Sequence, residues 1–133
     1  NNEWDCATVQ TLRAAILDLD VRDAAMALSV TDLRDAAERL WRELTCRLRG
    51  SGRASAATLL AHLHYVAGEG AYAGVALDCA LEADPAWNMA KLLDQAVRGG
   101  LRPIEMAEII DHSFVLGENM GVQMPARTME PAG

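Results

Sequence analysis

The sequence predicts an all-α protein in which about six to seven helices stack as antiparallel, tetratricopeptide-like hairpins. Hydrophobic residues make up 51% of its 133 residues, whereas aromatic residues make up only 5%. This balance favours helices, because β-branched and aromatic side chains are the ones that favour strands. We expect a single helical domain over residues 1–116. The periodicity is lost after Gly117, so residues 117–133 are expected to be a flexible tail or an extended segment that rests on a neighbour.

The first two helices are expected at residues 8–19 and 21–28. Leu12 and Ile16 show the helical spacing of apolar residues in the first. Asp20 precedes the second and is expected to be its N-cap, because its carboxylate can accept hydrogen bonds from the first turn.

The clearest amphipathic helix is expected at residues 32–49, with Thr31 as its N-cap. Its apolar stripe consists of Leu33, Ala36, Ala37, Leu40, Trp41, Leu44 and Leu48. The opposite face places an acid four residues before an arginine three times, which stabilises a helix. The glycines at positions 50 and 52 are expected to end it.

A hairpin is expected in the middle of the chain. Ser55 can cap a helix at residues 56–67, and Gly68 and Gly70 form a short turn. The following helix, at residues 71–83, contains only two charged residues. We therefore expect this second helix to lie inside the stack.

Two more helices follow. Asp84 and Pro85 together are typical of a helix start, which predicts a helix at residues 86–98. Gly99 and Gly100 end it, and Pro103 opens a last helix that reaches about residue 115.

Residues 55–85 also carry part of the tetratricopeptide pattern. When Pro85 is placed at the terminal proline of that pattern, Leu60 and Ala73 match as well. The Trp, Gly, Tyr and Phe positions instead hold Ala57, Ala61, His64 and Leu77. The sequence therefore predicts a tetratricopeptide-like stack rather than a regular array.

Four segments carry a wider resemblance. They are VRDAAM (21–26), LWREL (40–44), ATLLAHLHYVAGEGAYAGVALDCALEADPAW (57–87) and LLDQAVRGGL (92–101). In these segments the chain resembles an actinobacterial family known as domain of unknown function 4192. The resemblance implies the C-terminal helical region of that family, whose longer members have an α/β part before it. It implies no activity, because the family has none established.

The charge and the cysteines indicate the surroundings of the protein. A net charge of −7 disfavours non-specific binding to DNA or to an anionic membrane. No apolar run approaches the ~20 residues of a membrane span, and the first residues lack the layout of a signal peptide. Cys6, Cys46 and Cys79 form no CxxC pair, so we expect free, mostly buried thiols and a cytoplasmic protein.

Candidate contacts to a partner come from a local cluster of basic residues and one tryptophan. Residues 39–53 contain five arginines and only one acid. Arg42, Arg47, Arg49 and Arg53 are either a patch for an acidic partner or nucleic acid, or they complement the helix end and pair with neighbouring acids. Trp87 follows an expected helix start and is our first candidate for an exposed contact.

No catalytic residue, cofactor site or metal site is expected. The sequence contains no GxSxG, P-loop, HExxH or dinucleotide fingerprint. His62 and His64 are two apart on a helix and therefore point to opposite sides, with His64 expected to be structural. Glu108 and His112 are four apart, as in half of a metal site or on an ordinary polar face.

Our leading hypothesis is a non-enzymatic helical interaction or assembly domain that binds a protein or peptide. Self-association is also expected, because a helical stack needs its terminal apolar faces covered. The alternative is a nucleic-acid-associated regulator that uses the arginines of residues 39–53. A deep pocket lined by acids and histidine with strongly shifted pKa values would argue against the leading hypothesis.

Overall fold

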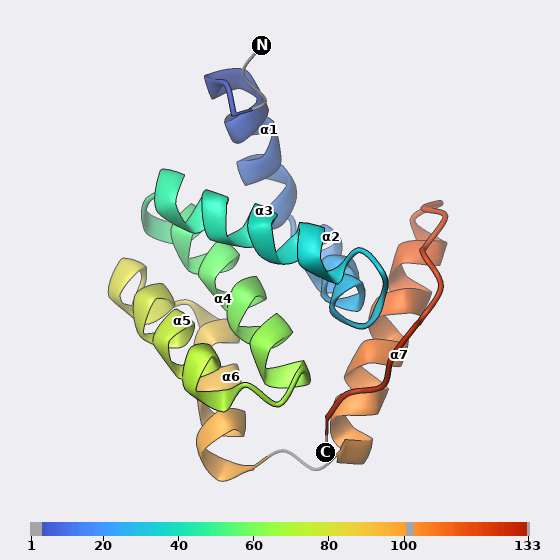
Figure 1. Cartoon of the computed structure of the whole chain (residues 1–133). Helices are drawn as coiled ribbons and strands as arrows, with labels where there is room; N and C mark the ends of the chain where they lie inside the picture. The colour runs from blue at the N-terminus through green and yellow to red at the C-terminus, as the bar shows by residue number, and fades with distance from the viewer. Residues whose placement is uncertain (1–3, 101–102, 133) are drawn as a thin grey trace.

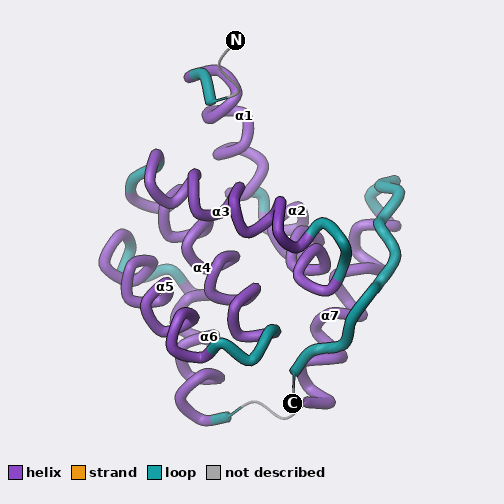
Figure 2. Tube along the Cα trace, viewed as in Figure 1, coloured by secondary structure: helices purple, strands orange, loops and turns teal. Residues whose placement is uncertain are grey.

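Seven α-helices and one 3₁₀ helix form the described part of the chain, residues 4–100 and 103–132 of a computed structural model (Figure 1). They are α1 (Cys6–Leu17), α2 (Leu19–Ala25), the 3₁₀ helix η1 (Met26–Val30), α3 (Arg34–Arg47), α4 (Gly50–Val66), α5 (Gly70–Ala83), α6 (Asn88–Gly99) and α7 (Pro103–Asn119). These described residues contain no strand, only an isolated β-bridge between Thr31 and Arg127 (Figure 2). The all-α prediction and its number of helices are confirmed.

Helices α3, α4 and α5 run in alternating directions, because only short turns connect them (Figure 1). The helix α4 packs between α3 and α5 and also contacts α1 and α6. The main hydrophobic core forms around it, from residues that include Trp41, Leu44, Leu63 and Leu77. The expectation that Trp41 belongs to the core is confirmed, since it is 5% exposed.

The most deeply buried helix is α4 rather than α5, although α5 packs on both α4 and α6. Thirteen of the 17 residues of α4 are buried, compared with four of the 14 residues of α5. Polar side chains on α4 can be buried because their hydroxyls form hydrogen bonds. Ser55 Oγ donates to Ile16 O at 2.7 Å, and Thr58 Oγ1 donates to Ala54 O at 2.6 Å. In contrast, α5 exposes Tyr72 (65%) and Val75 (70%).

The start of α4 also differs from its prediction. Gly50 is its first residue, so the glycines at 50 and 52 begin this helix rather than merely ending α3, and Ser55 is not its cap. A Cβ atom at Gly52 would meet Arg13 Cγ and Leu48 Cδ1 at 3.3 Å each. The missing side chain therefore allows α1 and the end of α3 to approach α4 closely.

The first residues of α2 and α6 also differ from the predicted ones, because other residues or turns precede these helices. Asp18, not Asp20, caps α2, because its Oδ1 accepts hydrogen bonds from Asp20 N at 3.0 Å and Val21 N at 3.1 Å. Asp84 closes a turn before α6, since its Oδ1 accepts from Ala86 N at 3.1 Å, and the helix starts only at Asn88. The predicted end of α6 is confirmed, with Gly100 in the left-handed region at φ 75°.

The last helix continues past its predicted end near residue 115, to Asn119. Of the two arrangements expected for the segment after Gly117, the structure has the extended one for residues 120–132 (Figure 1). Thr128 N donates to Val30 O and Ala132 N donates to Val66 O, both at 2.8 Å. This segment therefore connects η1 with the end of α4.

A second, smaller core cluster holds α7 on the molecule. It consists of Val30, Val66, Met106 and Ile110, with Tyr65 and Phe114 packed against it. The helix α7 also packs on α2 and η1. It stands apart from α6, which packs on α4 and α5 on the other side of the molecule (Figure 1). None of the described helices is long and apolar enough to cross a membrane.

Candidate functional site

Two of the arginines predicted as partner contacts pair with acids on their own helix. Arg42 donates to Glu38 at 2.8 Å and Arg47 to Glu43 at 3.0 Å. The guanidinium of Arg47 also lies 5.4 Å from the centre of the Trp4 ring. These two side chains thus have local partners that satisfy their charge.

The other two predicted arginines lie at the junction of α3 and α4. Arg53 Nε donates to Thr45 O at 2.9 Å and to Leu48 O at 2.8 Å, so it caps the end of α3. Arg49 is exposed, and none of the described ion pairs includes it. The structure therefore does not gather the four arginines into one group of unpaired cations.

Trp87, the predicted exposed contact, lies directly before α6 and is only half-exposed. Its ring packs against the main core, and its Nε1 is buried without a hydrogen-bond partner in the described part of the chain. The indole thus contributes to packing as well as to the surface.

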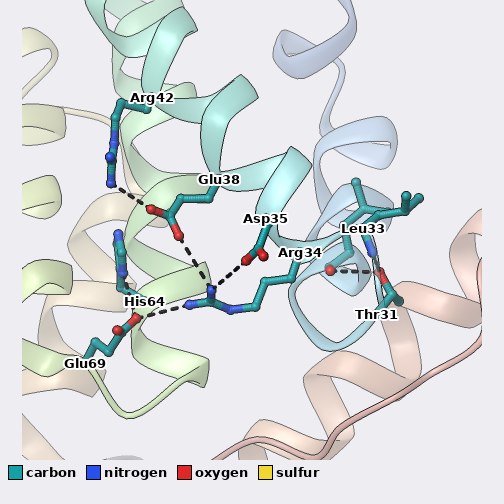
Figure 3. Close-up of polar contacts among 9 residues, drawn as sticks. Thr31, Leu33, Arg34, Asp35, Glu38, Arg42, His64 and Glu69 are labelled. Atoms are coloured by element: carbon teal, nitrogen blue, oxygen red, sulfur yellow. Dashed lines mark hydrogen bonds and ion pairs between the residues drawn. The ribbon is translucent and has the colours of Figure 1, made fainter.

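His64 belongs to a polar network that joins α3 to the turn between α4 and α5 (Figure 3). Its Nδ1 lies 2.9 Å from Glu69 Oε1, and because a carboxylate only accepts, the imidazole donates. Arg34 donates to the same oxygen at 3.1 Å and also pairs with Glu38 at 3.5 Å. The hydrogen bond from His64, followed by the charges of His64 and Arg34, lowers the pKa of Glu69. His64 is a structural histidine, as expected.

A cavity of about 580 Å³ lies between α6 and α7, and we refer to it as the α6–α7 cavity. It exists because α7 packs on α2 and η1 instead of on α6. Its described lining consists of Asp23, Met26, His62, Met89, Leu92, Leu93, Ala96, Glu105, Met106, Glu108, Ile109, His112 and Ser113. Most of these are apolar, and they come from α2, η1, α4, α6 and α7.

His62 is the one fully buried ionisable side chain in this lining, at 2% exposure. Its Nε2 atom has no hydrogen-bond partner among the described residues. Burial lowers the pKa of His62 from 6.5 to about 4, so its imidazole is neutral at pH 7. The side chain also lines a small void between α2, α4 and α6. The prediction that His62 and His64 point to opposite sides of their helix agrees with these surroundings.

The other ionisable side chains of the lining are acids and a second histidine. Asp23 pairs with Arg22 at 2.8 Å, while Glu108 and His112 are exposed. Glu105 also lines the cavity. No group of three or more possible metal ligands occurs in the part of the chain that the structure describes. Glu108 and His112 thus contribute to the cavity, where the sequence suggested either a polar face or half of a metal site.

The cysteines differ from their prediction. Cys6 and Cys46 are exposed and Cys79 is half-buried, so the expectation of mostly buried thiols is wrong, although all three are free. Burial raises the pKa of Cys79, which makes its thiol less reactive.

The α6–α7 cavity has only a weak signal in the sequence. Its one distinctive mark is His62, a polar residue within the apolar run of residues 56–63. A histidine in such a run is normally paired with a neighbouring polar group. The cavity also depends on α7 packing beside α2, far from it in sequence, and no local pattern predicts that contact.

Fold and cavity together define an all-α protein with an apolar cavity between two helices that do not pack on each other. Residues 1–104 match the family described as Domain of unknown function (DUF4192), and the chain belongs to this family. The resemblance seen in the sequence is thereby confirmed. No curated protein and no solved structure matches the chain. Almost all of α7 lies beyond the matched residues, so one wall of the cavity comes from outside them.

Proposed function

We propose that this protein is a non-enzymatic helical binding module whose protein or peptide partner inserts apolar side chains into the α6–α7 cavity. The cavity carries the proposal. Its volume of about 580 Å³ lies within the range of ligand sites, roughly 300–1,000 Å³. Such sites combine a mostly apolar lining with a few polar groups, as this one does.

A helical segment is the partner that suits the two walls best. Leu92 on α6 is 52% exposed and Ile109 on α7 is 39% exposed, and both line the cavity. A third helix between α6 and α7 would cover both side chains, in the way that amphipathic helices fill grooves between helices. The tetratricopeptide-like character of the α4–α5 hairpin remains part of this proposal.

An enzymatic role has less support. Two observations match what we named above as arguing against the leading hypothesis: acids and histidines line the cavity, and the pKa of His62 is lowered. However, a base with a pKa of about 4 removes protons poorly at pH 7, and no described acid is hydrogen-bonded to His62. His62 is therefore a poor candidate for a general base at pH 7.

The binding test uses two matched substitutions of exposed apolar residues. Leu92→Gln changes the cavity wall, whereas Val75→Gln changes the outer face of α5, away from the cavity. A labelled amphipathic helix of Leu and Lys would be titrated in fluorescence anisotropy. We expect Leu92→Gln to weaken binding about tenfold, since a buried Leu contributes roughly 1.5–3 kcal/mol, and Val75→Gln to leave it unchanged. Equal affinities of both variants and the parent would contradict the proposal.

Sedimentation of the same proteins separates a foreign partner from self-association, the other partner expected. A second copy that occupies the cavity would give a concentration-dependent dimer in the parent and in Val75→Gln, and a monomer in Leu92→Gln. Exposed Cys6 and Cys46 without disulfides also fit the cytoplasmic location that we propose.

One observation favours the alternative, nucleic-acid binding. A hollow of about 640 Å³ on α3 is lined by Trp4, Arg39 and Arg42, among others, so an aromatic ring lies beside two cations. Binding of single-stranded DNA that weakens steeply with salt, and is lost in Arg39→Ala, would support this function. Binding that is absent or insensitive to salt would dismiss it.

A further inference from the structure

The extended segment that follows α7 runs back along this helix, and we refer to residues 120–132 as the C-terminal strap (Figure 1). Its main contact with α7 is made by Arg127. The Nη2 atom of Arg127 donates to Asp111 Oδ1 at 2.6 Å, and the guanidinium lies 5.0 Å from the centre of the Phe114 ring. An ion pair and a cation–π contact therefore attach the strap to the second half of α7.

The end of the strap binds η1 and the end of α4. Thr128 N donates to Val30 O, and Ala132 N donates to Val66 O, both at 2.8 Å. The side chains of Val30 and Val66 pack with Ile110 of α7 in the smaller core cluster. The strap thus binds the carbonyl groups of the same two residues on whose side chains α7 packs. It links α7 to its own support.

The strap and the α6–α7 cavity lie against different faces of α7. Ile109 and His112 line the cavity, whereas Asp111 and Phe114 contact Arg127 of the strap. Successive residues of an α-helix are rotated by about 100°, so residues two apart lie on nearly opposite faces. The helix α7 therefore separates the strap from the cavity, and it forms a wall of the cavity while it is held from behind.

Without the strap, the attachment of α7 is limited. Among the described residues, α7 contributes Met106 and Ile110 to the buried part of the smaller core cluster. It packs on α2 and η1 and stands apart from α6. Elements with few buried apolar contacts open locally at a low free energy. The position of α7, and with it the shape of the cavity, therefore depends on the contacts that the strap adds.

We propose that the C-terminal strap regulates the α6–α7 cavity: the docked strap holds α7 in the position that forms the cavity wall, and release of the strap weakens binding there. This inference rests on the proposed function, because it assigns the regulation of the same cavity. Peptide binding and strap docking require the same position of α7. Each therefore stabilises the other, and this coupling is reciprocal.

The test breaks the contact between the strap and α7 in the full chain. Arg127→Gln removes the ion pair with Asp111, and Arg98→Gln, the matched control, removes an arginine–aspartate pair with Asp94 on α6. Hydrogen exchange is measured first, without a peptide. We expect the amides of α7 to exchange about fivefold faster in Arg127→Gln, the loss expected for one ion pair and one cation–π contact. Those of α4 should be unchanged, and Arg98→Gln should exchange like the parent.

A second variant releases the strap at its other end. Thr128→Pro removes the N–H group that donates to Val30 O and keeps Arg127. Neither Thr128 nor Val30 belongs to α7, so faster exchange of α7 in this variant shows that the strap transmits the loss.

The same proteins are then titrated with the labelled Leu–Lys helix. Both strap variants should bind it about threefold more weakly, because α7 is in place for a smaller fraction of the time. Arg98→Gln should bind it like the parent. In the parent, the bound peptide should in turn slow the exchange of the strap amides.

The outcomes separate this inference from the proposed function. Unchanged exchange of α7 in both strap variants overturns the role of the strap. Exchange that rises equally in α4 and α7 also overturns it, because the strap would then stabilise the whole fold. Faster exchange of α7 with unaltered peptide binding overturns the regulation and leaves the cavity as a peptide site. A parent that does not bind the peptide overturns the proposed function, while the exchange data still decide whether the strap holds α7.

Discussion

His62 and His64 lie two residues apart on the same buried helix, yet their surroundings are opposite. His64 donates to Glu69 at 2.9 Å within the network that Arg34 completes (Figure 3). His62 has a buried Nε2 without a described partner and lines a cavity of about 580 Å³. The same residue type thus stabilises the fold through hydrogen bonds on one side of α4 and, on the other, is buried with an unpartnered Nε2.

Packing follows the same division. On the side of α3 and α5, alanines such as Ala57, Ala61 and Ala73 are completely buried, so the helices approach closely. On the side of α6 and α7, the apolar Leu92 and Ile109 remain partly exposed around the cavity. The difference teaches that α4 is closely packed against α3 and α5, whereas α6 and α7 leave a cavity between them.

Truncating one leucine on each side sharpens this contrast. Leu77 is fully buried in the α4–α5 packing, so we expect Leu77→Ala to lower the free energy of unfolding by about 3 kcal/mol. Leu92 lines the cavity and is half-exposed, so Leu92→Ala should change the free energy of unfolding by less than about 0.5 kcal/mol. Urea denaturation at pH 7.5 measures both, and similar losses in the two variants would remove the distinction between the sides.

Acid should lower the free energy of unfolding because His62 is buried beside the cavity. The pKa of His62 is about 4 in the folded protein and 6.5 when exposed, so between these values the unfolded chain binds more protons. Stability present above pH 6.5 is then lost as the pH falls toward 4, by about 2 kcal/mol at pH 5. His62→Leu should lack this loss, so the two proteins are compared by urea denaturation at pH 7.5 and pH 5.

The charged groups around His62 are the same in both proteins. They are Arg22 and Asp23 on α2 and Glu105, Glu108 and His112 on α7. Their own titration therefore cancels in the comparison, provided that the cavity keeps its shape. Parallel acid profiles of the two proteins would show that His62 is charged or solvated in the folded state.

The polar network on the other side should contribute less. Arg34 is 18% exposed and contacts both Glu69 and Glu38, so Arg34→Ala is expected to cost about 1 kcal/mol. Arg42 also pairs with Glu38 but is 60% exposed, and Arg42→Ala should cost only a few tenths of a kcal/mol. Thermal unfolding at low and high salt compares them, and an equal cost would indicate that the network adds nothing beyond a surface pair.

The helices were predictable from the sequence because apolar spacing and glycine breaks are local signals. The degree to which each helix is buried was harder to predict from the sequence. The nearly uncharged sequence of α5 indicated a helix inside the stack, but α4 is the more buried helix. Its Ser55 and Thr58 can be buried because their hydroxyls are hydrogen-bonded within the fold. The opposite directions of His62 and His64 followed from helix geometry, whereas the cavity required the long-range docking of α7, which no local pattern records.

The stability of His62→Leu at pH 7.5, measured by urea denaturation, tests the central claim most directly. If the Nε2 atom of His62 makes no hydrogen bond that holds the fold together, replacing the imidazole with an apolar side chain removes an unsatisfied buried group. The variant should then be as stable as the parent or more stable by about 1 kcal/mol. A loss of more than about 2 kcal/mol would contradict the account, because the fold itself would then depend on His62.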